Sequence, residues 1–169
     1  MGRILKKKDI VEVLYGATFL GAGGGGSLKF GIDMLEKLDK DGEDIQLELL
    51  SIEEIEKDDY AAMVAGLGSP VRFLEGTPFG PDAVYAFKAF QKAFAAEGKH
   101  VKYIYSGEMG GLNTFVPMMV AILSDKDPKK RIKFIDADGN GRAVPELNTS
   151  LNSVRGYPPY PIGIVWHMT

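Results

Sequence analysis

Three short glycine-rich segments carry the residues best suited to chemistry in this chain, and the first is Gly21 to Ser27. It contains five glycines and ends in a hydroxyl group where a helix is predicted to begin. Glycine permits positive φ and close approach of a ligand, and the free N–H groups at a helix N-terminus attract anions. We therefore expect this segment to bind an anionic or carbonyl edge, although it could simply link two helices. Its candidate binding residues are Gly23, Gly24, Gly25, Gly26 and Ser27.

The second segment, Gly107 to Asn113, places the Glu108 carboxylate and the Asn113 amide around a tight turn before a predicted helix. Two interpretations are open. The two side chains could satisfy backbone N–H groups of the turn, or Glu108 could act as a general acid or base while Asn113 binds substrate.

The third segment, residues 136–142, begins with the D-x-D-x-N-G pattern that opens a calcium loop. The twelfth position of such a loop requires a bidentate Glu, and here it is Leu147. The two aspartates are therefore expected either to cap turns or to line a site. In the site, Asp138 would handle protons, Asp136 and Asp138 would hold a divalent metal ion, and Arg142 would pair with a substrate carboxylate.

Several other kinds of site find no support in the sequence. The two histidines, His100 and His167, lie outside any HxH or HExxH motif, and there is no cysteine. Neither a G-x-S-x-G elbow nor a GK[ST] phosphate loop occurs. The polyglycine segment follows a predicted helix, whereas a dinucleotide fingerprint follows a strand.

The composition is that of a globular domain with an ordinary core. The chain has 169 residues, 45% of them hydrophobic, and a net charge of −3, which argues against nucleic acid as a partner. No apolar run approaches the roughly 20 residues of a membrane span, and no signal peptide is recognisable, so we expect no membrane partner and a cytoplasmic location. The charged run Lys129-Lys130-Arg131 is expected on the surface.

Hydrophobic patterns predict strands that alternate with helices. Capping boxes at Asp9 and Ser51 and a cap at Ser27 mark three helix starts. The predicted helices are 9–20, 27–39, 81–97, 114–123, a short one after residue 51 and another within 145–154. The predicted strands are 45–50, near a sheet edge, 60–66, buried on both faces, 101–105, 131–135 and 162–166.

This alternation predicts an α/β fold, a three-layer α/β/α Rossmann-like sandwich with a mostly parallel sheet. Ligands bind such sheets at the carboxyl ends of the strands. The glycine-bearing turns after strands 60–66, 101–105 and 131–135 all belong to that edge, so we expect the functional site there.

Three motifs together resemble a known family: Gly16-Ala-Thr-Phe-Leu-Gly-Ala-Gly-Gly-Gly-Gly26, Gly107-Glu-Met-Gly-Gly-Leu-Asn-Thr-Phe-Val-Pro117 and Asp136-Ala-Asp-Gly-Asn-Gly-Arg-Ala-Val-Pro-Glu-Leu147. The chain resembles the N-terminal domain of the S-methyl thiohydantoin desulfurase family, whose members are linked to hydantoinase/oxoprolinase-type proteins. The resemblance implies a Rossmann-like domain followed by a second, β-rich domain. We expect residues 1–169 to form a single α/β domain without that second one.

The resemblance also implies attack on a five-membered cyclic imide or thio-imide, by hydrolysis or loss of a thiol. Our first hypothesis is an enzyme domain with a hydantoin-like small-molecule substrate. The alternative is a non-catalytic binding or assembly subunit of a hydantoinase/oxoprolinase-type partner, and a homo-oligomer is also left open.

Overall fold

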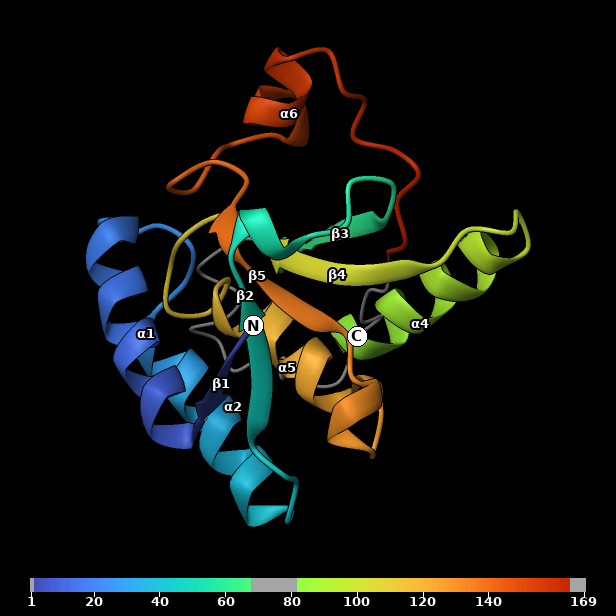
Figure 1. Cartoon of the computed structure of the whole chain (residues 1–169). Coiled ribbons are helices and arrows are strands. Elements are labelled where there is room, and N and C mark those ends of the chain that lie inside the picture. Colours follow the sequence, from blue (N-terminus) through green and yellow to red (C-terminus); the bar gives the residue numbers. More distant parts are fainter. Residues whose placement is uncertain (1, 68–81, 165–169) are drawn as a thin grey trace, which may run out of the picture.

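The structure, a computed structural model, describes residues 2–67 and 82–164 (Figure 1). Its strands are β1 (Arg3–Lys6), β2 (Gln46–Leu50), β3 (Tyr60–Val64), β4 (Val101–Ser106) and β5 (Lys133–Asp138). Its α-helices are α1 (Lys7–Gly21), α2 (Leu28–Lys40), α4 (Asp82–Ala95), α5 (Phe115–Ser124) and α6 (Leu151–Val154). Single 3-10 turns are η1 (Ile52–Glu54), η2 (Pro128–Lys130) and η3 (Leu147–Thr149).

The described strands form one sheet in the order β1-β2-β5-β4-β3. β1 runs antiparallel to β2, and the other neighbouring pairs are parallel. The predicted α/β fold with a mostly parallel sheet is therefore confirmed. β1 was not predicted, because four residues are too few to establish a period.

β3 corrects one prediction, because residues 60–66 were expected to be buried on both faces. Within the described chain β3 pairs only with β4 and lies at the edge of the sheet. Tyr60 is 42% exposed, and Ala61 is exposed as well. An unbroken apolar run thus indicated a strand correctly but not its place in the sheet.

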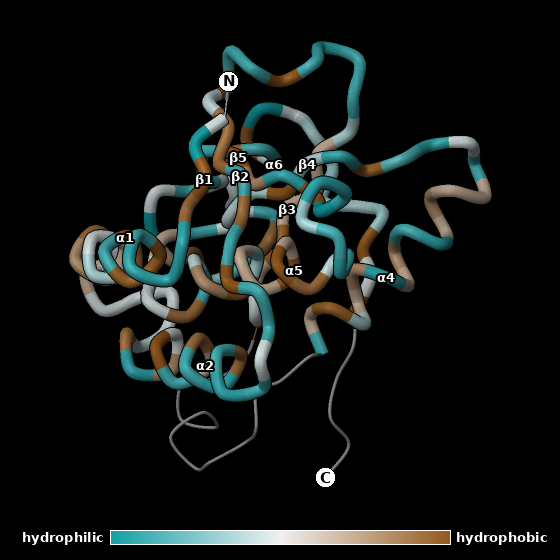
Figure 2. Tube along the Cα trace, turned by 60° about the horizontal axis from the view of Figure 1, so that its bottom comes forward, coloured by the Kyte–Doolittle hydropathy of each residue, from teal (hydrophilic) through white to brown (hydrophobic). Residues whose placement is uncertain are grey.

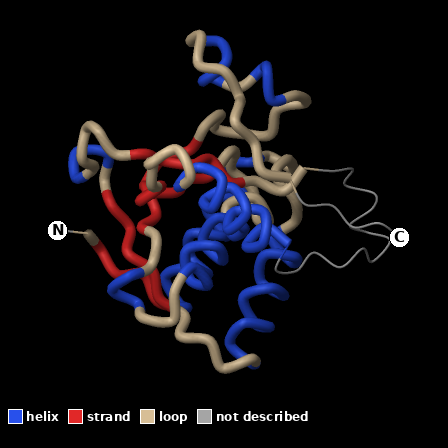
Figure 3. Tube along the Cα trace, turned by 90° about the vertical axis from the view of Figure 1, so that its right-hand side faces the viewer, coloured by secondary structure: helices blue, strands red, loops and turns tan. Residues whose placement is uncertain are grey.

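The long helices cover one face of the sheet and enclose the main core. α5 lies at its centre and packs against β2, β3, β4 and β5 as well as α2 and α4. It is apolar all round and buried along Phe115–Ile122, as expected of a helix that packs on every side (Figure 2). Figure 3 shows these helices on one side of the strands. Among the described helices, none combines the length and apolarity needed to cross a membrane.

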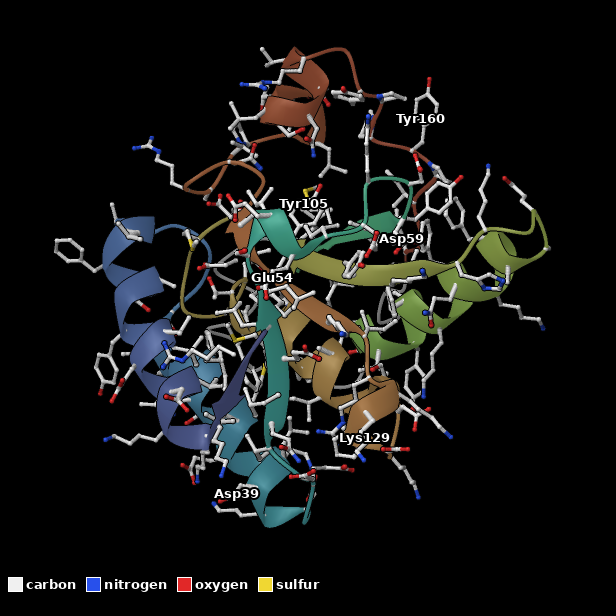
Figure 4. All side chains as sticks on the ribbon, in the orientation of Figure 1. Asp39, Glu54, Asp59, Tyr105, Lys129 and Tyr160 are labelled. Atoms are coloured by element: carbon white, nitrogen blue, oxygen red, sulfur yellow. The ribbon has the colours of Figure 1, made fainter. Side chains whose placement is uncertain are left out.

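The opposite face of the sheet has a thinner covering. Leu50, Tyr103 and Ile135 form a small apolar cluster there, against which Ile55 packs after η1. Tyr105 lies between the sheet and α6 (Figure 4), and its hydroxyl accepts a hydrogen bond from the Asn152 amide at 3.0 Å. This side layer is therefore built from short turns and the segment after β5.

Local signals at the predicted helix starts have mixed outcomes. Ser27 is the N-cap of α2, and its Oγ accepts the N–H of Phe30 at 3.4 Å. The Ser51 box is confirmed too, since Glu54 Oε2 accepts the Ser51 N–H at 3.0 Å, although the helix is only a 3-10 turn. The expectation at Asp9 was wrong: α1 starts two residues earlier, and the Asp9 carboxylate accepts the Lys6 N–H at 3.0 Å.

Two further boundaries differ from expectation. The strand predicted to end at residue 135 continues to Asp138, so the D-x-D residues belong to β5 instead of a loop. Of the strand predicted at 162–166, residues 162–164 are not a strand, and the remainder lies outside the described residues.

Arg131 was expected on the surface with its two lysine neighbours, but its side chain is buried. Its Nε donates to the carbonyl of Asp125 at 3.0 Å, and its Nη1 donates to those of Asp44 and Gln46, both at 2.8 Å. A guanidinium can be buried here because carbonyl oxygens at the ends of two elements surround it.

Candidate functional site

The three glycine-rich segments meet beyond the carboxyl ends of the strands. The carbonyl of Gly25 accepts the N–H groups of Leu112 at 3.2 Å and Asn113 at 2.9 Å. On the other side, the Asn140 amide donates to the Gly107 carbonyl at 2.7 Å. Gly25 and Asn113, more than 80 residues apart in sequence, are thus joined directly.

Close packing explains why much of the polyglycine segment is glycine. Gly25 has φ +67°, and a Cβ there would overlap the carbonyl oxygen of Met109. On the partner segment, a Cβ at Gly111 would overlap the backbone of Leu28, at the start of α2. The two loops therefore touch backbone to backbone, which only residues without a side chain allow.

Gly23 is the member of the segment most open to a ligand. It is exposed with φ +95°, and a Cβ there would have no atom within 4 Å. By contrast, Gly24 lies beside Ala143, Gly26 packs on Leu112, and the hydroxyl of Ser27 caps α2. The predicted five-residue binding segment is thus divided between packing and exposed backbone.

The Glu108 carboxylate bridges two of the loops. Its Oε1 accepts a hydrogen bond from the Asn113 amide at 2.5 Å, and its Oε2 accepts the N–H of Val144 at 3.2 Å. The side chain is half-buried. The backbone N–H that Glu108 accepts thus belongs to the segment after β5 instead of its own turn, and the two contacts together hold its carboxylate in one orientation.

Asp138 caps a turn with one of its oxygens. Asp138 Oδ1 accepts the N–H of Asn140 at 2.8 Å and also that of Gly141. An aspartate that accepts backbone N–H groups two and three residues ahead stabilises the turn it precedes. The turn-capping alternative for Asp138 thus has direct geometric support.

Asp136 and Arg142 are the more accessible charged candidates. Both are exposed, and Asp136 borders a cavity of about 60 Å³ next to Ser106, Met109 and Thr114. An exposed carboxylate or guanidinium can pair with a charged or polar group of a small molecule.

A metal ion at Asp136 and Asp138 would need further ligands beside these two carboxylates. Within residues 2–67 and 82–164, no three or more Asp, Glu, His or Cys residues are grouped so that they could hold one. The metal site stays a prediction that rests on these two aspartates alone.

Sequence reasoning missed several participants in this arrangement. Ser106 donates its hydroxyl hydrogen bond to the Glu108 carbonyl at 2.8 Å, and Gly66 bonds to the Asn113 side chain through its N–H at 2.8 Å. A polar residue at a strand end could have drawn attention to Ser106. Gly66 and Val144 contribute only backbone atoms, for which side-chain type is no signal.

The chain is similar to known proteins over nearly its whole length. The family model described as "S-Me-THD-like, N-terminal domain" matches residues 8–167. The chain is also similar to the crystal structure of a protein from Chromobacterium violaceum, with 28% identity and a TM-score of 0.78. The match covers 94% of this chain and 41% of the other, so this chain spans about two fifths of that protein's length. No curated protein matches.

Proposed function

We propose that this chain, which belongs to the S-Me-THD-like family because it matches that family's N-terminal domain, is an enzyme domain. Its substrate would be a small hydantoin-like ring, a cyclic imide or thio-imide. The observation that carries this proposal is the junction of the three glycine-rich segments at the carboxyl edge of the sheet. Ligands of parallel α/β sheets bind at that edge. The family description points to a thiohydantoin-related role, and the reaction itself is our proposal.

The proposed reaction is hydrolysis or thiol elimination at a ring carbon. With an S-methyl thio-imide, water adds to the carbon that carries sulfur, a C–O bond forms and the C–S bond breaks. The thiol leaves with one proton of the water, the ring nitrogen of the former C=N bond takes the other, and the carbon that carried sulfur becomes a carbonyl group. Either Glu108 or Asp138 would receive the first proton from water, and a positioned carboxylate is suited to that step.

The remaining roles follow from exposure and charge. Arg142 would pair with a carboxylate on the substrate, since it is exposed. Gly23, whose backbone is accessible, would donate its N–H to the carbonyl edge of the ring, as an oxyanion-hole group does. Asp136 would border the same space beside the small cavity.

Release of thiol from an S-methyl thiohydantoin tests the proposal directly. The purified chain should release thiol, detected with a chromogenic disulfide, and any ring opening should be followed by NMR. Glu108→Gln should lower turnover by about 10²-fold or more if Glu108 moves the proton. Asp138→Asn keeps an oxygen to cap the turn but removes the charge, so it separates catalysis from turn stability.

Asp33→Asn is the matched control, because this exposed α2 carboxylate pairs with Lys29 away from the strand ends. Its turnover should equal that of the wild type, and thermal unfolding should show that each variant is folded. A folded wild-type chain that neither releases thiol nor opens a hydantoin ring would refute the catalytic proposal for this chain.

The second candidate function is a binding or assembly subunit for a hydantoinase/oxoprolinase-type partner. It is favoured by large apolar side chains exposed at the end of α1 and along the last described segment. Phe19 is 85% exposed, and Tyr160, at 71%, points away from the sheet (Figure 4). The others are Tyr15, Leu20, Leu151, Val154, Tyr157, Ile162 and Ile164.

Sedimentation of the chain, alone and with a purified hydantoinase-type protein, tests this second candidate. Phe19→Ser and Val154→Ser should each weaken association, whereas Tyr85→Ser, on an exposed site of α4, should not. A chain that stays monomeric with and without that protein would rule out this role.

A further inference from the structure

Asn113 joins segments that are far apart in sequence through a single buried amide. Its Oδ1 accepts the N–H of Gly66 at 2.8 Å, and its Nδ2 donates both to the Gly66 carbonyl at 3.1 Å and to Glu108 Oε1 at 2.5 Å. Its backbone N–H donates to the carbonyl of Gly25 at 2.9 Å. The side chain is only 4% exposed, so these bonds form away from water.

The chemistry of this position requires an amide. One side of the side chain must accept a hydrogen bond, and the other must donate two, which a primary amide alone provides at this length. A carboxylate there would place an acceptor against two further acceptors, the Gly66 carbonyl and the Glu108 carboxylate. Buried acceptors that face each other without a proton between them are unfavourable.

We propose that Asn113 is a positioning residue for the Glu108 carboxylate. Asn113 is itself held by its hydrogen bonds to Gly66 and to Gly25 of the polyglycine segment, and its amide in turn fixes the orientation of Glu108. This inference rests on the proposed function for the importance of Glu108. It also replaces the expected role of Asn113 in binding substrate, because both Nδ2 hydrogens already have acceptors and the amide is buried. The other end of the carboxylate is held by the N–H of Val144 at 3.2 Å.

Exchanging donor and acceptor between the two side chains tests this assignment. In N113D the introduced carboxylate repels Glu108, and in E108Q one donor of the introduced amide faces another donor. Amide hydrogen exchange at Val144 should become faster by about tenfold in either single variant, the equivalent of one lost hydrogen bond. In N113D/E108Q the introduced amide can donate to the introduced carboxylate and still accept the N–H of Val144.

The double variant should therefore regain protection at Val144, to within about threefold of the wild type. Exchange at Val120, in the centre of α5, reports the overall fold, and Asn152→Asp on α6 is the matched control for the asparagine change. Effects in the double variant that equal the two single effects combined would overturn the assignment. So would unchanged exchange at Val144 in N113D.

The exchange measurement needs no substrate, so its failure is distinct from failure of the proposed function. If the chain released no thiol but Val144 exchange still showed coupling between residues 108 and 113, the catalytic proposal would be refuted and the positioning role of Asn113 would stand. In an active chain, N113D should lower kcat about tenfold or more with little change in KM, because the carboxylate is displaced while binding groups stay in place. A change in KM alone would instead return Asn113 to a substrate-binding role.

Discussion

Replacing Gly25 by alanine tests why the polyglycine segment consists of glycine. If the segment is glycine for the sake of loop packing, Gly25→Ala should destabilise the fold itself. The added Cβ would overlap the carbonyl oxygen of Met109, and the residue would keep a φ of +67°. If glycine served only ligand approach, the fold would lose little beyond the backbone strain.

The expected loss combines two contributions. A left-handed backbone conformation costs an alanine about 1–2 kcal/mol. Relieving the overlap must separate the loops and weaken the bonds that the Gly25 carbonyl accepts from Leu112 and Asn113, each with a net value of about 0.5–1.5 kcal/mol. The free energy of unfolding should fall by about 2–5 kcal/mol, which corresponds to a Tm lower by about 4–20 °C for a domain of this size.

Three other glycine-to-alanine variants separate these contributions. Gly23→Ala carries the backbone strain alone, with φ +95° and nothing within 4 Å of its Cβ. Gly31→Ala carries the overlap alone, because its Cβ would meet the Gly111 carbonyl from within α2. Gly16→Ala, on the exposed side of α1, should stabilise the helix by up to about 1 kcal/mol.

Urea unfolding followed by circular dichroism measures all four variants under the same conditions. The order of stability should be Gly16→Ala above the wild type, then Gly23→Ala, with Gly25→Ala the least stable or level with Gly31→Ala. Equal stability of Gly25→Ala and Gly23→Ala, within about 0.5 kcal/mol, would refute the backbone-to-backbone contact.

Two further predictions concern charged side chains away from the candidate site. Arg131→Lys should lower the free energy of unfolding by about 2 kcal/mol or more, since one ammonium cannot reach all three carbonyls that Arg131 holds; an unchanged urea midpoint would contradict this. The hydrogen bond from the backbone N–H of Lys6 lowers the pKa of Asp9 below its ordinary 3.8. The ionised Asp9 carboxylate therefore stabilises the folded state fully above that pH, and this contribution to stability is lost as the pH falls through the lower pKa of the folded state. The Tm of the wild type should therefore fall more steeply than that of Asp9→Asn below about pH 3.8, and parallel curves would show that the contact is absent.

Features encoded within a few neighbouring residues could be predicted from the sequence. The cap at Ser27 and the box at Ser51 depend on hydrogen bonds that span three residues. The apolar run of α5 and the alternation of strands and helices likewise depend on local periodicity, and they were sufficient for the fold class. The glycine-rich turns could also be assigned to one edge of the sheet, because parallel strands end on the same side.

Other features depended on which distant segments become neighbours. The burial of Arg131 required the carbonyl groups of Asp44 and Gln46, and the orientation of Glu108 required Val144. Backbone groups such as these are the same in every residue type, so no sequence pattern identifies them as partners.

The sequence by itself therefore determined the class of fold, the helix caps and the edge at which the glycine-rich turns gather. Only the tertiary structure decided that β3 lies at an edge of the sheet formed by the described residues. It also decided that the Asn113 side chain bonds to Gly66 and Glu108 and that Gly25 is needed for packing. The physical reason is the sequence separation over which each interaction acts, because hydrophobic periodicity and helix capping involve only residues a few positions apart. Burial, donor–acceptor pairing and van der Waals overlap are settled by residues that only the fold brings together.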